Sequence, residues 1–249
     1  MSRAIHSMDF VVGELSARLF SVSKQKNSEV VVICHGFASN QNSSKIQLIK
    51  DWALKHEKSV ITFDFCGHGE SGGRFGDLTI TRSSRDTNSI IDHAIRNLHF
   101  QRIILVGFSY GGLVATVVTS QRSDIYRLVL ISSLIDYHEK EMLLNRQKVI
   151  IEWAKTGIRE YIINDARLYL DYAYYKDSLQ YSAYSLLKNS GTNVTLVHAE
   201  NDEMVPYQQA VRLAKEMSID LYTIKGSDHR LSTLSAKEEL VLYLDNFAV

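Results

Sequence analysis

Residues 102–119 read RIILVGFSYGGLVATVVT, and this stretch decides the fold. An apolar strand expected at 102–106 runs directly into the turn Gly107-Phe108-Ser109-Tyr110-Gly111, and an apolar helix follows at once. A serine on so sharp a turn needs small residues two positions to either side, because side chains there would collide. The turn would hold the Ser109 hydroxyl at a helix N-terminus, where backbone N–H groups favour a developing anion. The competing interpretation is a glycine-rich turn that binds phosphate or merely connects two elements.

The rest of the chain repeats an alternation of short β-branched runs and longer helical patterns. Further strands are expected at 29–34, 59–63, 127–132, 193–198 and 220–224, and helices near 44–57, 83–98, 110–121, 206–217 and 235–247. Two short runs around Gly13-Glu14 indicate a hairpin. The alternation predicts βαβ units and hence an α/β fold with a mostly parallel, doubly wound sheet.

One segment interrupts this alternation. Residues 136–189 show no convincing strand, but they contain many helix-forming residues and eight tyrosines. We therefore expect a helical cap insertion at 136–189 over one end of the sheet, with 1–135 and 190–249 forming the core. Each tyrosine could simply pack the insertion onto the core, whereas the group suggests an amphipathic lining for a binding pocket.

Composition excludes several classes of protein. The chain has 249 residues, with 28 Lys and Arg against 28 Asp and Glu, and a net charge of zero argues against nucleic-acid binding. No apolar stretch is long enough for a secretory signal or a membrane span. Cys34 and Cys66 lack the spacing of a disulfide framework or a zinc site, so we expect reduced, packed thiols. We expect a cytoplasmic protein, and its oligomeric state stays open.

A nucleophilic serine needs a base and an acid. His229 lies on the loop after the last expected strand, and an imidazole can take and return a proton near neutral pH. The acid belongs on the loop after the preceding strand, where Glu200, Asp202 and Glu203 offer three carboxylates. We choose Asp202, because Pro206 is expected to start the next helix and would leave Asp202 at the tip of the loop. Asp228 is adjacent to His229, and neighbouring side chains in an extended loop diverge.

The loop after strand 29–34 completes the expected site. Gly36 lets the backbone turn so that the N–H of Phe37 can point at a carbonyl oxygen, with the N–H of Tyr110 as the second oxyanion donor. His35 is expected to be structural, with its ring bonded to neighbouring backbone. The loop from Asp64 to Ser71 is expected to be a tight structural turn, since Asp64 and His68 lack the further ligands that a metal site needs. We expect neither a metal nor a cofactor.

These motifs, in this order, resemble the α/β-hydrolase superfamily. They are the His35-Gly36 turn, the Asp64–Ser71 loop, the Gly107–Gly111 turn, the Asp202–Pro206 loop and the Gly226–His229 loop. The resemblance runs from about residue 28 to the end, without the insertion, and is greatest to small bacterial serine esterases related to feruloyl esterases and monoacylglycerol lipases. The insertion lacks the strand-like cap of feruloyl esterases, so their phenol-binding residues are not carried over.

The resemblance implies a serine hydrolase that cleaves small-molecule carboxylic esters of small or medium acyl groups through an acyl-enzyme. Ser109 would be the nucleophile, His229 the base and Asp202 the acid. An acyl thioesterase or acyltransferase would use the same residues on another acyl donor. A small-molecule receptor that kept these residues without turnover is a third hypothesis, from a different functional class.

Overall fold

The computed structural model describes residues 4–22, 28–163, 165–188 and 190–246. Within these ranges one eight-stranded sheet has the order β1-β2-β4-β3-β5-β6-β9-β10. Its strands are β1 (His6–Val12), β2 (Leu15–Ser21), β3 (Glu29–Cys34), β4 (Ser59–Phe63), β5 (Arg102–Phe108), β6 (Ile125–Ile131), β9 (Asn193–Ala199) and β10 (Leu221–Ile224). The expected hairpin is β1–β2, which turns at Gly13 with φ of +62°.

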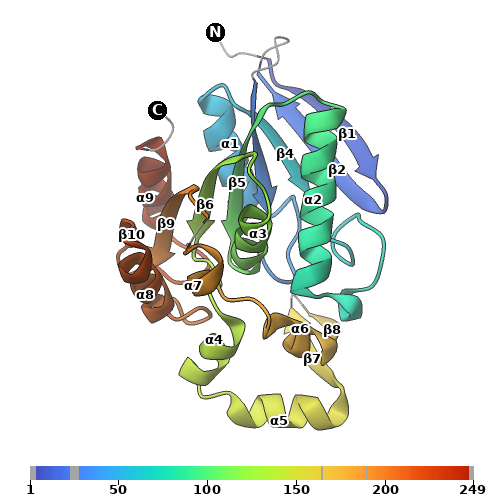
Figure 1. Ribbon diagram of the computed structural model, residues 1–249, viewed down its shortest axis with the longest axis vertical. Coiled ribbons are helices and arrows are strands. Elements are labelled where there is room, and N and C mark those ends of the chain that lie inside the picture. Colours follow the sequence, from blue (N-terminus) through green and yellow to red (C-terminus); the bar gives the residue numbers. More distant parts are fainter. Residues whose placement is uncertain (1–3, 23–27, 164, 189, 247–249) are drawn as a thin grey trace.

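Strand direction brings the candidate loops to one edge. Strand β2 pairs antiparallel with both β1 and β4, and the series β4-β3-β5-β6-β9-β10 is joined by parallel pairs throughout. The carboxyl ends of parallel strands lie at the same edge, which is where open α/β sheets place ligands. The loops after β3, β5, β9 and β10 therefore meet at the lower edge of the sheet in Figure 1.

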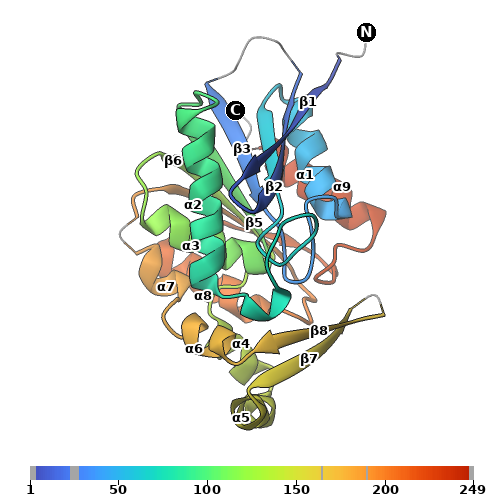
Figure 2. The ribbon, with the colours of Figure 1, turned by 90° about the vertical axis from the view of Figure 1, so that its right-hand side faces the viewer.

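Helices cover both faces of the sheet. Helices α1 (Ser44–Lys55) and α9 (Leu234–Asp245) pack on one face, and α2 (Ile80–Arg96), α3 (Tyr110–Ser120) and α8 (Tyr207–Met217) pack on the other (Figure 2). A short 3₁₀ helix, η1 (Phe75–Asp77), precedes α2. Helix α2 begins at Ile80, three residues earlier than expected, because the Thr79 side chain accepts a hydrogen bond from the Arg82 N–H and caps it.

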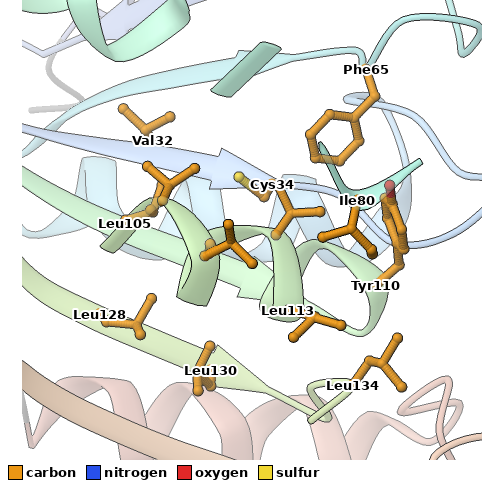
Figure 3. Packing of buried hydrophobic residues seen from close by; sticks show 14 of the residues in the cluster. Val32, Cys34, Phe65, Ile80, Leu105, Tyr110, Leu113, Leu128, Leu130 and Leu134 are labelled. Carbon is orange, nitrogen blue, oxygen red and sulfur yellow. The ribbon is translucent and has the colours of Figure 1, made fainter. Parts of the chain in front are cut away.

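The strands beneath these helices are apolar on both sides. On the face shown in Figure 3, Val32, Leu105 and Leu128 from three adjacent strands belong to the same buried cluster as Leu113 of α3. Most of these side chains have no exposed surface at all. A buried Leu or Val contributes about 1.5 to 3 kcal/mol relative to an exposed one, so this packing holds β5 and α3 in a fixed relation. The turn that connects them, at Ser109, is therefore held in place by β5 on one side and α3 on the other.

A separate layer lies beyond the carboxyl edge of the sheet (Figures 1 and 2). It comprises α4 (Tyr137–Leu143), α5 (Gln147–Thr156), β7 (Ile158–Ile163), β8 (Ala166–Asp171) and α6 (Ala173–Ser178). A β-bridge between Asp136 and Ser182 joins its two ends, and we call residues 136–182 the cap. Helix α7 (Ala183–Leu186), which we expected in the insertion, contacts α3 and α8 of the core.

The insertion is largely helical, but the expectation that it holds no strand is wrong. Strands β7 and β8 form an antiparallel hairpin with Ile163 paired to Ala166. Alternating exposure along β7 marks a two-sided strand, and Gly157 ends α5 with φ of +75°, a conformation that glycine tolerates. Apolar residues occur on both faces of β7, so the sequence lacks the simple apolar-polar alternation of a half-buried strand. The expectation that the insertion lacks strand-like structure, in contrast to feruloyl esterases, is therefore also wrong.

The other expected elements lie close to their predicted bounds, with strand ends displaced by two residues at most. Asn189, at the end of the expected insertion, and Phe247, at the end of the expected last helix, fall outside the described residues. Cys34 and Cys66 are buried free thiols. Within the described ranges, no helix is both long and apolar enough to cross a bilayer.

Candidate active site

Ser109 occupies a strained turn between β5 and α3. Its φ is +54° with ψ of −119°, a backbone conformation that residues with side chains rarely adopt. The Ser109 N–H donates to the Ile131 carbonyl at 3.0 Å and the Leu134 N–H donates to the Ser109 carbonyl at 3.0 Å, which ties the turn to the end of β6. The Ser109 side chain is thereby fixed at the carboxyl edge of the sheet.

The two glycines flanking Ser109 are required by close backbone contacts. A Cβ on Gly107 would lie 2.5 Å from the Gly111 carbonyl oxygen, and one on Gly111 would lie 2.5 Å from the carbonyl oxygen of His35. Both distances are far below van der Waals contact, and the neighbours are backbone atoms held by the sheet. The structure therefore shows the steric reason that the sequence predicted for glycine at positions 107 and 111.

His229 reaches Ser109 from the loop between β10 and α9. Its Nε2 is 2.9 Å from the Ser109 Oγ, and its ring lies 5.4 Å from the Phe108 ring, centroid to centroid. The His229 backbone N–H donates to Glu203 Oε2 at 3.2 Å, which ties the histidine loop to the loop after β9. The side chain is 5% exposed, so the imidazole is held in one orientation by its surroundings.

Asp202 lies on the far side of the imidazole. Its Oδ2 is 2.6 Å from His229 Nδ1, while its Oδ1 accepts hydrogen bonds from the N–H groups of Met204 and Val205. Burial opposes a charged carboxylate here, but hydrogen bonds from His198 and His229 outweigh it and lower the pKa of Asp202 to about 2. Asp202 is therefore an anion with both oxygens bonded, and the structure brings Ser109, His229 and Asp202 into one line.

The neighbouring carboxylates have other partners. Glu200 accepts a hydrogen bond from the Gly226 N–H, and Asp228 accepts from both the N–H and the hydroxyl of Ser232. Glu203 is exposed and accepts a hydrogen bond from the His229 backbone N–H. None of the hydrogen bonds found for these three carboxylates in the described structure reaches the His229 imidazole.

The sequence interpretation missed His198, a fully buried side chain near the end of β9. Its Nε2 lies 3.3 Å from Asp202 Oδ2 and 3.1 Å from the Val205 carbonyl oxygen. The available signal was an imidazole inside an apolar strand, four residues before the chosen acid. A buried polar group of this kind calls for a partner nearby.

Two backbone amides belong to the turns next to Ser109, since Tyr110 follows the serine and Phe37 follows Gly36, where an added Cβ would lie 3.5 Å from the Ser109 Cβ. In the described part of the chain, the N–H groups of Phe37 and Tyr110 have no hydrogen-bond acceptor. The Tyr110 hydroxyl donates to the Thr79 carbonyl at 3.1 Å and lies within hydrogen-bond distance of Ser83 Oγ, at 2.7 Å, which anchors the start of α3 to α2. Free donors beside a serine at a helix N-terminus are suited to holding a negatively charged oxygen.

His35 and the loop from Asp64 to Ser71 form hydrogen bonds that hold the neighbouring loops at the carboxyl edge of the sheet. His35 Nδ1 lies 2.8 Å from the Gly36 carbonyl, and its Nε2 accepts from the Phe65 N–H at 3.1 Å. Burial lowers the pKa of His35 to about 3, so its ring is neutral. The Asp64 carboxylate accepts hydrogen bonds from Gln41 and from the Glu70 N–H. The described residues contain no group of three or more His, Cys, Asp or Glu side chains that could hold a metal.

Comparison with known proteins agrees with this architecture. A family model described as serine aminopeptidase, S33, matches residues 25–168, more than half of the chain. The palmitoyl-protein thioesterase ABHD10, mitochondrial, of Rattus norvegicus is 25% identical over 246 residues, covering 94% of this chain and 79% of that protein.

Solved structures share the fold over nearly the whole chain. A putative hydrolase from Agrobacterium vitis has a TM-score of 0.79 and 22% identity, with 99% of this chain and 100% of that chain covered. Est1E from Butyrivibrio proteoclasticus, solved with ferulic acid bound, has a TM-score of 0.75 and 21% identity, covering 97% and 100%. Because the family model matches more than half of the chain, from β3 through β6 and into the cap, the chain belongs to the serine aminopeptidase, S33, family of α/β hydrolases.

Proposed function

We propose that this protein is a serine hydrolase that cleaves carboxylic esters of small or medium acyl groups. The observation that carries the proposal is the unbroken series of hydrogen bonds from the Ser109 Oγ through His229 to Asp202, at 2.9 Å and 2.6 Å. A serine hydroxyl is a weak nucleophile by itself and needs an adjacent base that is oriented by a third group. These three side chains have the separations that such a catalytic triad requires.

In the proposed reaction, the Ser109 oxygen attacks the ester carbonyl carbon while His229 Nε2 takes the hydroxyl proton. The tetrahedral intermediate collapses, the bond to the alcohol oxygen breaks, and His229 returns the proton to the leaving alcohol. A water molecule then attacks the acyl-serine with His229 again as base, releasing the carboxylic acid and restoring Ser109. Asp202, already ionised, stabilises the imidazolium that forms in each half of the reaction.

The unbonded amides of Phe37 and Tyr110 are the proposed oxyanion hole. Each would donate to the oxygen that becomes negatively charged in the tetrahedral intermediate. Loss of one such donor typically costs about 3 to 4 kcal/mol of transition-state stabilisation. His35, Gly36, Gly107 and Gly111 support these donors and the serine, by backbone hydrogen bonds or by leaving room for the turn.

The cap supplies aromatic surface next to this hole. The Phe37 ring lies 4.9 Å from the ring of Tyr161 on β7 and 6.3 Å from that of Tyr174 on α6, measured between centroids. Aromatic rings offer large apolar surfaces, and Tyr adds a polar tip. This supports the proposal that the cap shapes the acyl site, which was one of the two interpretations of its tyrosines.

A thioesterase is the second candidate, because one named relative is a palmitoyl-protein thioesterase. The same three residues could attack a thioester, and the acyl-enzyme would be identical. An acyltransferase would differ only in the acceptor that takes the acyl group from Ser109. A receptor without turnover is less well supported, because the hydrogen bonds from Ser109 to Asp202 are intact.

The test compares p-nitrophenyl esters of increasing acyl length with acyl-CoA thioesters, on the wild-type protein and on Ser109→Ala. We expect a fluorophosphonate probe to label the wild type and not the variant, and kcat/KM to be higher for esters than for thioesters. Labelling that survives Ser109→Ala would place the nucleophile elsewhere. Much faster thioester cleavage would favour the second candidate, and tight binding with no turnover would favour a receptor.

The proposed chemistry requires no cofactor, since every proton transfer is assigned to His229. A cytoplasmic location stays a prediction, and the rat relative is named as a mitochondrial protein. Fractionation of the native cells with an antibody to the chain would decide between the two.

A further inference from the structure

The cap contains a buried carboxylate surrounded by three cations. The Glu141 side chain, on α4, has no exposed surface. Its Oε1 lies 2.8 Å from Lys140 Nζ and 3.6 Å from Arg146 Nη1, and its Oε2 lies 3.3 Å from Arg159 Nη1. Arg159 comes from the inner face of β7, so the cluster joins the first helix of the cap to its hairpin.

The charges of this cluster do not balance. Lys140 and Arg159 are shielded, with side chains 13% and 18% exposed, whereas Arg146 is 38% exposed and solvated. In the part of the chain that the structure describes, Glu141 is the one carboxylate paired with either shielded cation. The shielded trio therefore carries a net charge of +1. Burial, together with the neighbouring arginines, outweighs Glu141 and lowers the pKa of Lys140, whereas burial of Arg159 is outweighed by its interactions with Tyr161, Tyr137 and Glu141, which raise its pKa.

Arg159 lies close to the proposed oxyanion hole. Its guanidinium is 4.7 Å from the centroid of the Tyr161 ring, and that ring is 4.9 Å from the Phe37 ring. One aromatic ring therefore separates the guanidinium from the residue whose amide would hold the oxyanion.

Lys140 is connected to the same site by a second path. Its Nζ is 4.4 Å from the centroid of Tyr137, which packs at 5.0 Å against Tyr174. Tyr174 in turn lies 6.1 Å from Tyr110, the residue after the nucleophile. The two cations thus lie against a continuous series of aromatic rings that reaches Phe37 and Tyr110, the two residues of the proposed oxyanion hole.

We propose that Lys140 and Arg159 recognise a carboxylate on the substrate, so that the preferred ester carries a negative charge away from the bond that is cleaved. This inference rests on the proposed hydrolase function and adds a substrate class to it. A carboxylate would neutralise the net charge of the trio, whereas a phosphate dianion would overcompensate it. A guanidinium presents parallel N–H donors that match the two oxygens of a carboxylate.

The test compares charged esters with uncharged esters of similar size. On the acyl side the pair is mono-p-nitrophenyl adipate and p-nitrophenyl heptanoate. On the alcohol side the pair is 4-acetoxybenzoate and its methyl ester. We expect the charged member of one pair to have the higher kcat/KM by about tenfold or more, and the pair that shows it tells which part of the substrate carries the carboxylate. Equal or lower kcat/KM for the charged member of both pairs would overturn the proposal.

The variants Lys140→Met and Arg159→Met remove one charge each and keep an apolar chain over the aromatic ring. A hydrogen bond to a charged group contributes about 1.5 to 3 kcal/mol, so each variant should lower the ratio of charged to uncharged kcat/KM roughly 10-fold to 100-fold. Lys140→Arg, which conserves the charge, should restore most of the ratio. A variant that lowers kcat/KM equally for the charged and the uncharged ester would show that the cluster only stabilises the cap, and this would contradict the proposal.

Arg167→Met is the matched control. Arg167 lies on the outer face of the same hairpin, 67% exposed and paired with Glu160, so its loss should leave the ratio unchanged. An equal drop in the ratio for Arg167→Met would point to general electrostatic attraction and would contradict the proposed site.

A binding measurement separates failure of this inference from failure of the hydrolase function. Calorimetry on Ser109→Ala with the mono-4-nitroanilide of adipic acid and with the 4-nitroanilide of heptanoic acid needs no turnover. Calorimetry with 4-acetamidobenzoate and its methyl ester covers the alcohol side. If no ester is cleaved but a charged amide binds more tightly and loses this advantage with Arg159→Met, the anion site stands and the proposed chemistry fails. If esters are cleaved and charge brings no advantage in binding or turnover, the chemistry stands and the anion site fails.

Discussion

Nε2 of His198 lies 3.3 Å from Asp202 Oδ2, the same oxygen that is bonded to Nδ1 of His229. The proposed catalytic carboxylate is therefore bonded to two imidazoles, of which only His229 contacts the nucleophile. We infer that His198 acts through Asp202, as a positioning residue. Because the His198 side chain is fully buried at β9, it holds the Asp202 carboxylate in a fixed position relative to the sheet.

We predict that His198→Leu lowers kcat about tenfold with little change in KM, because one hydrogen bond to a charged group is lost. His198→Gln keeps a donor in nearly the same place and should recover most of the rate. Steady-state kinetics on p-nitrophenyl butyrate would measure both. Equal losses in the two variants would show that packing, and not the hydrogen bond, explains the effect.

Asp202→Asn should lower kcat by roughly 10⁴-fold, because an amide stabilises the wrong tautomer of the base and leaves the imidazolium without a counter-charge. Glu203→Gln is the matched control, since Glu203 bonds the backbone of the same histidine and not its ring. We expect less than a tenfold loss in that control, measured as single-turnover rates. A larger loss for Glu203→Gln than for Asp202→Asn would reverse the assignment of the acid.

Gly111→Ala should destabilise the fold by roughly 3 kcal/mol or more, because the new methyl would overlap the carbonyl oxygens of Cys34 and His35. Gly36→Ala meets a milder contact, 3.3 Å from a carbon of the Phe108 ring, and should cost under about 1 kcal/mol. Urea unfolding at neutral pH would compare the two. Similar losses would mean that the turn around Ser109 relaxes more than its packing implies.

Stability should fall as the pH drops below about 6.5, because burial lowers the pKa of His35 to about 3. Between these values an unfolded imidazole binds a proton that the folded one does not, so acid favours unfolding by up to about 1.4 kcal/mol per pH unit. The effect is absent above the unfolded pKa.

The measurement is the free energy of unfolding in urea at pH 7.5 and 5.5. We expect His35→Asn to be less stable at pH 7.5 yet less sensitive to pH, and His6→Asn, at an exposed position, to behave as the wild type. An unchanged pH dependence in His35→Asn would assign the effect to another group.

The sheet and the turns at its edge could be predicted because their signals are local. The apolar run before Gly107 predicts a buried strand. The glycines around Ser109 are needed because a Cβ at Gly107 or Gly111 would overlap neighbouring backbone atoms. Asp202 was chosen from its place in a loop, and the structure puts its carboxylate beside His229. For these elements, the position of a residue after a strand is enough to place it at the carboxyl edge.

The hairpin of the cap and the roles of His198 and Glu141 could not be predicted in this way. Strand β7 has apolar residues on both faces, so its periodicity did not distinguish it from a helix. Glu141 is buried and is paired with Lys140, its neighbour in sequence, and with Arg159 on another element. Such pairings depend on how segments fold over one another, which a one-dimensional pattern does not contain.

The bridge between Asp136 and Ser182 gives the cap a single point of exit from the sheet and return to it. Because departure and return are adjacent, the intervening segment can lengthen, shorten or be exchanged without displacing the loops that hold Ser109, Asp202 and His229. Under the proposed role of the cap, evolution can thus alter which substrates are accepted without changing the residues that would break the bond. The same junction is a natural place to graft a foreign cap when a new specificity is to be engineered.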